Sequence, residues 1–87
     1  MANVLMYCTA VCPYCTMAER LLTRKGVTQI TKVRVDLDHQ KMDEMMKKTG
    51  RRTVPQIYID DFHVGGFDDL AELDQDGKLS PLLVQTN

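Results

Sequence analysis

The chain has 87 residues, of which 44% are hydrophobic and 26% charged, so we expect residues 1–87 to form a single folded domain and not a disordered or repetitive chain. Eleven Lys and Arg residues face twelve Asp and Glu residues, giving a net charge of −1, which argues against a nucleic-acid-binding protein. No apolar run approaches the roughly 18 residues of a membrane span. The start Met1-Ala2-Asn3-Val4 lacks the features of a signal peptide, and we therefore expect a protein of the reducing cytoplasm.

The first predicted elements are a strand and a helix. Val4–Cys8 is a short apolar run of the kind found in strands buried on both faces. A helical pattern begins at Pro13, and Gly26 is well placed to end it. The expected apolar face of this helix consists of Met17, Leu21 and Leu22.

A second strand and a second helix follow. Residues 30–36 alternate in polarity, which predicts a strand with one apolar face. Asp38 is a suitable N-cap for a helix that Gly50 would end. The apolar stripe of that helix consists of Met42, Met45 and Met46.

The last third of the chain predicts a hairpin and a helical region. Residues 55–64 hold two apolar segments around Asp60-Asp61, a pattern typical of a tight hairpin. Gly65-Gly66 then breaks the strand, and Asp68 or Asp69 is expected to cap a final helical region. Its apolar positions are Leu70, Leu73, Leu79, Leu82 and Leu83.

The order β-α-β-α-β-β-α constrains the architecture. Two strands joined through a helix are expected to be parallel, with a right-handed crossover. Two strands joined by a hairpin must be antiparallel. The sequence therefore predicts an α/β fold with a mixed four-stranded sheet and helices on both faces.

The three cysteines, Cys8, Cys12 and Cys15, lie close together in the sequence, which indicates a chemically reactive site and not a structural disulfide framework. Cys12-Pro13-Tyr14-Cys15 falls at a predicted helix N-terminus, where residues three apart share a face and two sulfurs can approach bonding distance. The free N–H groups and partial positive charge there favour a thiolate on Cys12. Cys15, one turn deeper, should keep its proton more readily, so the pair is suited to thiol–disulfide exchange.

Other interpretations of the cysteines are weaker. A zinc site would need a second Cys pair, and His39 and His63 lack finger-like spacing. The Cys8-x₃-Cys12-x₂-Cys15 spacing resembles the cluster loop of radical S-adenosylmethionine enzymes, whose large barrel cannot be built from 87 residues. Cys8 closes an apolar strand and is interpreted as a small core residue, with a redox-sensitive thiol as the alternative.

Three motifs occur in this order along the sequence: Cys12-Pro13-Tyr14-Cys15, Thr53-Val54-Pro55 and Gly65-Gly66-Phe67-Asp68-Asp69. Together they resemble the motifs of dithiol glutaredoxins, most closely the small bacterial glutaredoxin 3 class, and the resemblance extends over residues 3–84. The resemblance implies a thioredoxin fold with a cis peptide bond before Pro55. It also implies a glutathione-dependent thiol–disulfide oxidoreductase in which Cys12 is the nucleophile, Cys15 the resolving residue, and the two form a redox-active disulfide. Glutathione would be a co-substrate, with no metal and no tightly bound cofactor.

The resemblance also implies a set of residues that bind glutathione. The Val54 backbone would pair with the cysteinyl part, and Arg51 would attract the glycyl carboxylate. The N–H groups at the start of the last helix could bind the γ-glutamyl carboxylate, and Asp68 or Asp69 its ammonium group. The full predicted set is Tyr14, Arg51, Thr53, Val54, Pro55, Gly66, Phe67, Asp68 and Asp69. The alternatives are that the aspartates only cap a helix, that the basic residues only complement a helix end, and that Pro55 simply begins an edge strand.

One position departs from the family pattern. Relatives commonly carry Lys three residues before the first active cysteine, where this chain has Thr9. The helix terminus and Arg51 or Arg52 would then have to supply the positive potential, and we expect weaker handling of glutathione than in a lysine-bearing relative.

The resemblance also suggests partners and rival functions. The expected partners are glutathione and disulfide-containing or glutathionylated proteins, with ribonucleotide reductase as a family-level candidate, and we expect a monomer. One rival is a glutaredoxin-like redoxin that thioredoxin reductase reduces. Another is a [2Fe–2S] carrier in which two Cys12 thiolates and two glutathiones bridge a dimer, which the rigid ring of Pro13 disfavours.

Overall fold

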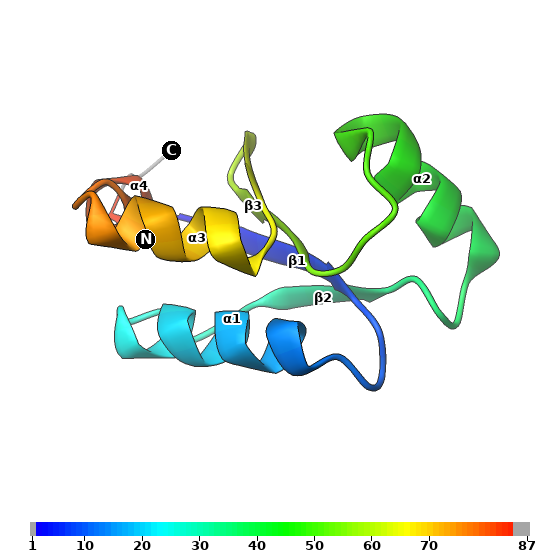
Figure 1. Cartoon of the computed structure of the whole chain (residues 1–87), viewed down its shortest axis with the longest axis horizontal. Helices are drawn as coiled ribbons and strands as arrows, with labels where there is room; N and C mark the ends of the chain where they lie inside the picture. Colours follow the sequence, from blue (N-terminus) through cyan, green and yellow to red (C-terminus); the bar gives the residue numbers. More distant parts are fainter. Residues whose placement is uncertain (1, 85–87) are drawn as a thin grey trace.

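The computed structural model describes residues 2–84; Met1 and residues 85–87 of the predicted single domain lie outside the described part. A mixed sheet carries helices on both of its faces (Figure 1). In chain order the elements are β1 (Val4–Cys8), α1 (Pro13–Arg24), β2 (Thr31–Arg34), α2 (His39–Thr49), β3 (Gln56–Ile59), β4 (Phe62–Gly65), α3 (Phe67–Gln75) and α4 (Leu79–Leu83). None of the helices in residues 2–84 has the length and apolar character needed to cross a membrane.

The four strands have the spatial order β2-β1-β3-β4. β1 pairs in parallel with β2 and antiparallel with β3, and β3 pairs antiparallel with β4. The predicted parallel pair and antiparallel hairpin are therefore both confirmed, and the hairpin turns at Asp60, whose φ is 52°. Helices pack on both faces of the sheet, and four of the five residues of β1 are buried, as its apolar sequence predicted.

Two apolar clusters lie on opposite faces of the sheet, because alternate side chains of a strand point to opposite sides. Met6 and Cys8 of β1 pack in the cluster that also holds buried residues of α1, α3 and α4. Tyr7, between them, packs in the other cluster with Met45 of α2. Figure 1 accordingly shows α1 and α3 side by side, with α2 set apart from them. The Tyr7 hydroxyl donates a hydrogen bond of 2.7 Å to Glu44, which ties α2 to the sheet.

The apolar face of α1 differs from the predicted one at Met17, whose side chain is 43% exposed. Cys15 and Ala18 are buried instead, together with Leu21 and Leu22. Met17 follows Cys15 by two positions, which places it about 200° around the helix axis from that residue. The small Cys15 and Ala18 therefore mark the buried stripe better than the larger methionine does.

The C-terminal helical region also differs from the prediction. It consists of two helices, α3 and α4, and Gly77 between them has a φ of 72°. The N-cap of α3 is Gly66, so the prediction that Asp68 or Asp69 is the cap was wrong. The helix begins directly after β4, so Asp69 occupies its third position, where its carboxylate accepts a hydrogen bond of 2.9 Å from the Gly66 N–H.

Candidate active site

Cys12 and Cys15 form a disulfide at the N-terminus of α1, with their Cα atoms 5.2 Å apart. Cys12 is the N-cap residue in extended conformation, Pro13 begins the helix, and the Cys15 N–H lies 3.1 Å from the Cys12 sulfur. Cys12 is partly exposed, whereas Cys15 is only 5% exposed. The predicted placement of the pair is therefore confirmed, and the disulfide is its oxidised state.

The segment before β3 passes close to this pair. The peptide bond between Val54 and Pro55 is cis, as the family resemblance implied. The Val54 carbonyl oxygen lies 3.9 Å from the Cys12 sulfur. The Val54 backbone therefore lies within reach of a group bound at the Cys12 sulfur.

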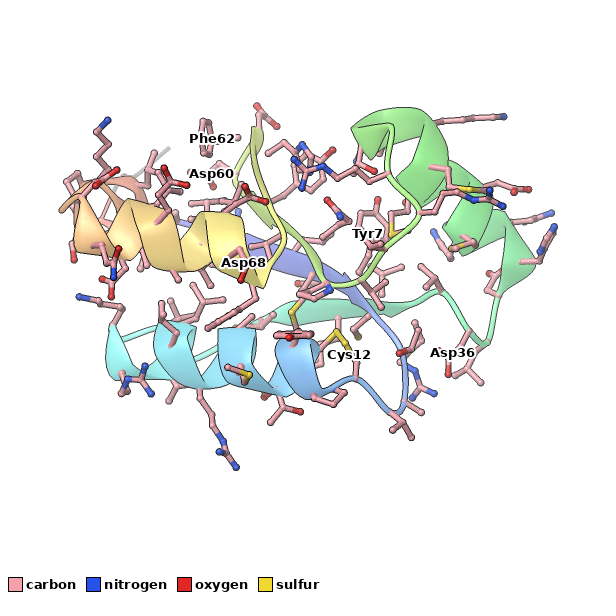
Figure 2. The ribbon with its side chains drawn as sticks, viewed as in Figure 1. Tyr7, Cys12, Asp36, Asp60, Phe62 and Asp68 are labelled. Atoms are coloured by element: carbon pink, nitrogen blue, oxygen red, sulfur yellow. A yellow bond between two sulfur atoms is a disulfide. The ribbon has the colours of Figure 1, made fainter. Side chains whose placement is uncertain are left out.

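A groove of about 330 Å³ opens beside the bend and between the starts of α1 and α3. The two helices run in the same direction from this end of the sheet, and Figure 2 shows the disulfide at the start of one and Asp68 at the start of the other. The aromatic rings of Tyr14 and Phe67 flank the groove, with centroids 6.2 Å apart. Its lining consists of Tyr14, Arg51, Thr53, Val54, Pro55, Gly66, Phe67, Asp68 and Asp69. These are the nine residues that the sequence assigned to glutathione; the structure brings them together, and their role in binding remains a prediction.

Charged groups of the groove already contact one another. Arg51 donates a hydrogen bond of 2.9 Å from Nη1 to Oδ2 of Asp69, the same oxygen that accepts from Gly66. The Arg51 guanidinium, followed by the Gly66 N–H, lowers the pKa of the Asp69 carboxyl. Arg51 and Asp69, which the sequence analysis assigned to the glycyl carboxylate and to the ammonium group of glutathione, are therefore paired with each other. Asp68, the alternative for the ammonium group, is exposed.

The loop that leads to Cys12 is held by Asp36, a residue that the sequence analysis did not single out. Its carboxylate accepts a hydrogen bond of 3.2 Å from the Ala10 N–H and two of 2.7 Å from Arg34. Because Arg34 donates to it, the pKa of the Asp36 carboxyl lies well below its usual range. Parallel strands end at the same edge of a sheet, so an acidic residue just after β2 was a usable signal for a contact with the loop after β1.

Cys8 is 4% exposed and packs in the same apolar cluster as Cys15. Burial raises the pKa of its thiol, so the neutral form is favoured. The interpretation of Cys8 as a core residue is confirmed.

The fold and the cysteine pair define a thiol–disulfide oxidoreductase of the thioredoxin-fold class, and comparison with known proteins narrows this class. The family model described as Glutaredoxin matches residues 4–64. Glutaredoxin 3 of Escherichia coli strain K12 is 51% identical over 83 residues, which cover 95% of this chain and 99% of the relative. The chain belongs to the glutaredoxin family, whose members are glutathione-dependent oxidoreductases with glutathione as a co-substrate.

Solved structures agree with this assignment. The solution structure of glutaredoxin from Brucella melitensis superimposes with a TM-score of 0.82 at 42% identity, covering 95% of this chain and 89% of that one. The crystal structure of a buckwheat glutaredoxin–glutathione complex superimposes with a TM-score of 0.86 at 28% identity, covering 94% and 76%. The predicted thioredoxin fold is therefore confirmed.

Proposed function

We propose that Cys12 is the nucleophile and Cys15 the resolving residue in the reduction of protein disulfides and of mixed disulfides with glutathione. The observation that carries this proposal is the position of the pair: the more exposed sulfur caps α1 beside the groove, and the deeper one lies within bonding distance. A helix N-terminus stabilises a thiolate, which is both the attacking and the leaving form in disulfide exchange.

In the two-cysteine route, the Cys12 thiolate attacks one sulfur of a protein disulfide, and the other sulfur leaves as a thiolate that takes up a proton. The Cys15 thiolate then attacks the Cys12 sulfur of the mixed disulfide. The Cys12–Cys15 disulfide forms, and the second substrate thiol is released. The substrate gains two electrons and two protons. The enzyme pair supplies both electrons and the Cys15 proton, and solvent supplies the second proton because Cys12 starts as a thiolate.

In the one-cysteine route, the Cys12 thiolate attacks the glutathione sulfur of a glutathionylated protein and becomes glutathionylated itself, while the protein sulfur leaves as a thiolate that takes up a proton. A second glutathione thiolate attacks that sulfur, which releases oxidised glutathione and the Cys12 thiolate. Two glutathiones likewise reset the Cys12–Cys15 disulfide, the first by opening it and the second by freeing Cys12.

The groove is proposed to hold the tripeptide during these steps. An extended peptide can pair with the Val54 backbone like an added strand, beside the Cys12 sulfur. The first N–H groups of α3 have no partner within the helix and would bind the γ-glutamyl carboxylate. Arg51 and Asp69 would exchange their mutual contact for the opposite charges of the ligand. The buckwheat relative solved as a glutathione complex supports this proposal.

The proposal extends to the protein's setting. We propose a monomeric, single-domain protein over residues 1–87 that acts in the cytoplasm. Its substrates would be disulfide-containing and glutathionylated proteins, and ribonucleotide reductase is a candidate among them. The net charge of −1 gives no electrostatic support for a nucleic-acid partner.

A reductase-coupled assay tests the proposed activity. The reduced protein is given a glutathionylated peptide together with glutathione, glutathione reductase and NADPH, and in parallel the same peptide with thioredoxin reductase and NADPH. We expect NADPH oxidation only in the glutathione arm. Turnover only in the thioredoxin reductase arm would contradict the proposal and favour the redoxin alternative, whereas a brown protein after anaerobic purification would favour the [2Fe–2S] carrier.

Thr9→Lys is expected to increase glutathione turnover in the same assay. Thr9 lies in the loop just before Cys12 and contacts the Val11 carbonyl at 3.4 Å. A lysine ammonium there would add positive charge near the Cys12 sulfur and near a carboxylate of glutathione, an effect of about two- to five-fold for a screened, exposed charge. The pH dependence of Cys12 alkylation should shift to lower pH. No change in turnover or in alkylation would show that the position contributes nothing in this chain.

A further inference from the structure

Apart from Tyr7 with its hydroxyl, Gln56 is the one buried polar side chain among residues 2–84, with an exposed fraction of 0%. It is the first residue of β3 and follows the Val54–Pro55 bend directly. A buried amide without partners costs about 1–3 kcal/mol, whereas an apolar side chain of similar size carries no such penalty. We therefore expect the Gln56 amide to make hydrogen bonds that a leucine at this position could not make.

The hydrogen bonds of Gln56 fix the orientation of its amide. Nε2 lies 3.0 Å from the Thr53 carbonyl oxygen and 3.3 Å from the Thr53 hydroxyl. Oε1 lies 2.9 Å from Nε2 of His63. A carbonyl oxygen cannot donate, so the nitrogen end of the amide must face Thr53 and the oxygen end must face His63. It follows that His63 carries a proton on Nε2 and donates it to Gln56.

His63 is held in place by the sheet. It lies on β4 opposite Tyr58 of β3, and the two rings stack with centroids 5.0 Å apart. Burial, and after it the Arg51 guanidinium, lower the pKa of His63, so the imidazole is favoured in its neutral form. The neutral ring then has one N–H, and that proton is committed to Gln56.

We propose that His63 and Gln56 are positioning residues for the groove, because the His63 N–H orients the Gln56 amide, whose two N–H groups hold Thr53 and thereby the Thr53–Val54–Pro55 bend. Neither residue lines the groove; Thr53 does. The Thr53 carbonyl is turned toward Gln56, while the Val54 carbonyl stays on the side of Cys12. The inference rests on the proposed role of this bend in binding glutathione.

His63→Phe tests the first step of this proposal, the hydrogen bond from His63 to Gln56. Phenylalanine keeps a ring to stack on Tyr58 but lacks the N–H. We expect KM for a glutathionylated peptide to rise about five-fold, as for the loss of one net hydrogen bond, with kcat unchanged within about two-fold. His63→Gln should recover the wild-type KM, because its side-chain amide offers an N–H at nearly the same distance from the backbone. Rescue by a residue without a ring separates the hydrogen bond from the packing of the ring.

Gln56→Glu tests the second step, the hydrogen bonds from Gln56 to Thr53. A carboxylate has the shape of the amide but cannot donate to either oxygen of Thr53. We expect a rise in KM at least as large as that of His63→Phe. If this variant fails to fold, the side-chain amide protons of Gln56 give a second measurement: in NMR hydrogen exchange they should be protected in the wild type and in His63→Gln, and should exchange faster in His63→Phe.

The control is His39→Phe, the same substitution at the other histidine of the chain, whose side chain is 90% exposed. It should leave KM and the Gln56 amide protons unchanged. A wild-type protein without glutathione-coupled turnover would overturn the proposed function of the groove itself. An active wild type with an unchanged KM in His63→Phe would overturn the positioning role alone, and so would a raised KM that His63→Gln does not recover.

Discussion

Cys12→Ser is expected to lose both the reduction of protein disulfides and the removal of glutathione from mixed disulfides. Activity should fall by more than about a thousand-fold, because a serine hydroxyl is not ionised near neutral pH and cannot act as the exchanging sulfur. The two thiols that remain in this variant, Cys8 and Cys15, are only 4% and 5% exposed, so neither can take over.

Cys15→Ser is the matched variant. It should lose the two-cysteine route but keep deglutathionylation, since that route needs only Cys12 and a second glutathione. Mass spectrometry after incubation with oxidised glutathione should find one glutathione on Cys12 in this variant and none in Cys12→Ser. A Cys15→Ser protein that cannot deglutathionylate, or a Cys12→Ser protein that can, would show that the two roles are assigned wrongly.

Gly65→Ala is expected to have the largest effect outside the cysteine pair. Gly65 has a φ of 111°, which L-residues rarely adopt. A Cβ at this position would also clash with the Asp69 carboxylate and lie 3.0 Å from Nη1 of Arg51. Backbone strain and the displaced Asp69 together should lower the free energy of unfolding by about 2–4 kcal/mol.

Gly77→Ala is the control for backbone strain alone. Gly77 has a φ of 72°, but a Cβ there would meet no atom within 4 Å. Its cost should be about 1 kcal/mol, with KM for glutathione unchanged. Denaturant unfolding and KM measurements on both variants separate the two effects, because only Gly65→Ala should raise KM. Equal losses of stability with equal KM values would show that the contact between Gly65 and Asp69 has no role in the groove.

Much of the fold could be predicted because most helices and strands have a clear local pattern in the sequence. The apolar run of β1, the alternation in β2 and the hairpin around Asp60 fix the element order, and chain connectivity then fixes which strands are parallel. The errors occurred where local chemistry allows more than one solution. An aspartate near a helix start suits the N-cap and the third position equally well, and only the exit of β4 makes Gly66 the cap.

The sequence predicted which residues form the candidate site but not which of them contact one another. The cysteine motif and the family resemblance named all nine lining residues of the groove. The bond between Arg51 and Asp69 spans 18 positions, and the one between His63 and Gln56 depends on the pairing of β3 with β4. Neither contact leaves a pattern in the sequence, because each depends on how two elements meet in space.

The Arg51–Asp69 contact has a consequence for turnover. In the proposed binding mode, glutathione would exchange the Arg51–Asp69 contact for contacts with its own charged groups and would gain no ion pair in total. When glutathione leaves, the Arg51–Asp69 contact would form again and offset part of the energy lost on release. We therefore expect glutathione to stay in the groove only briefly, which suits an enzyme that must take up a fresh glutathione in every cycle.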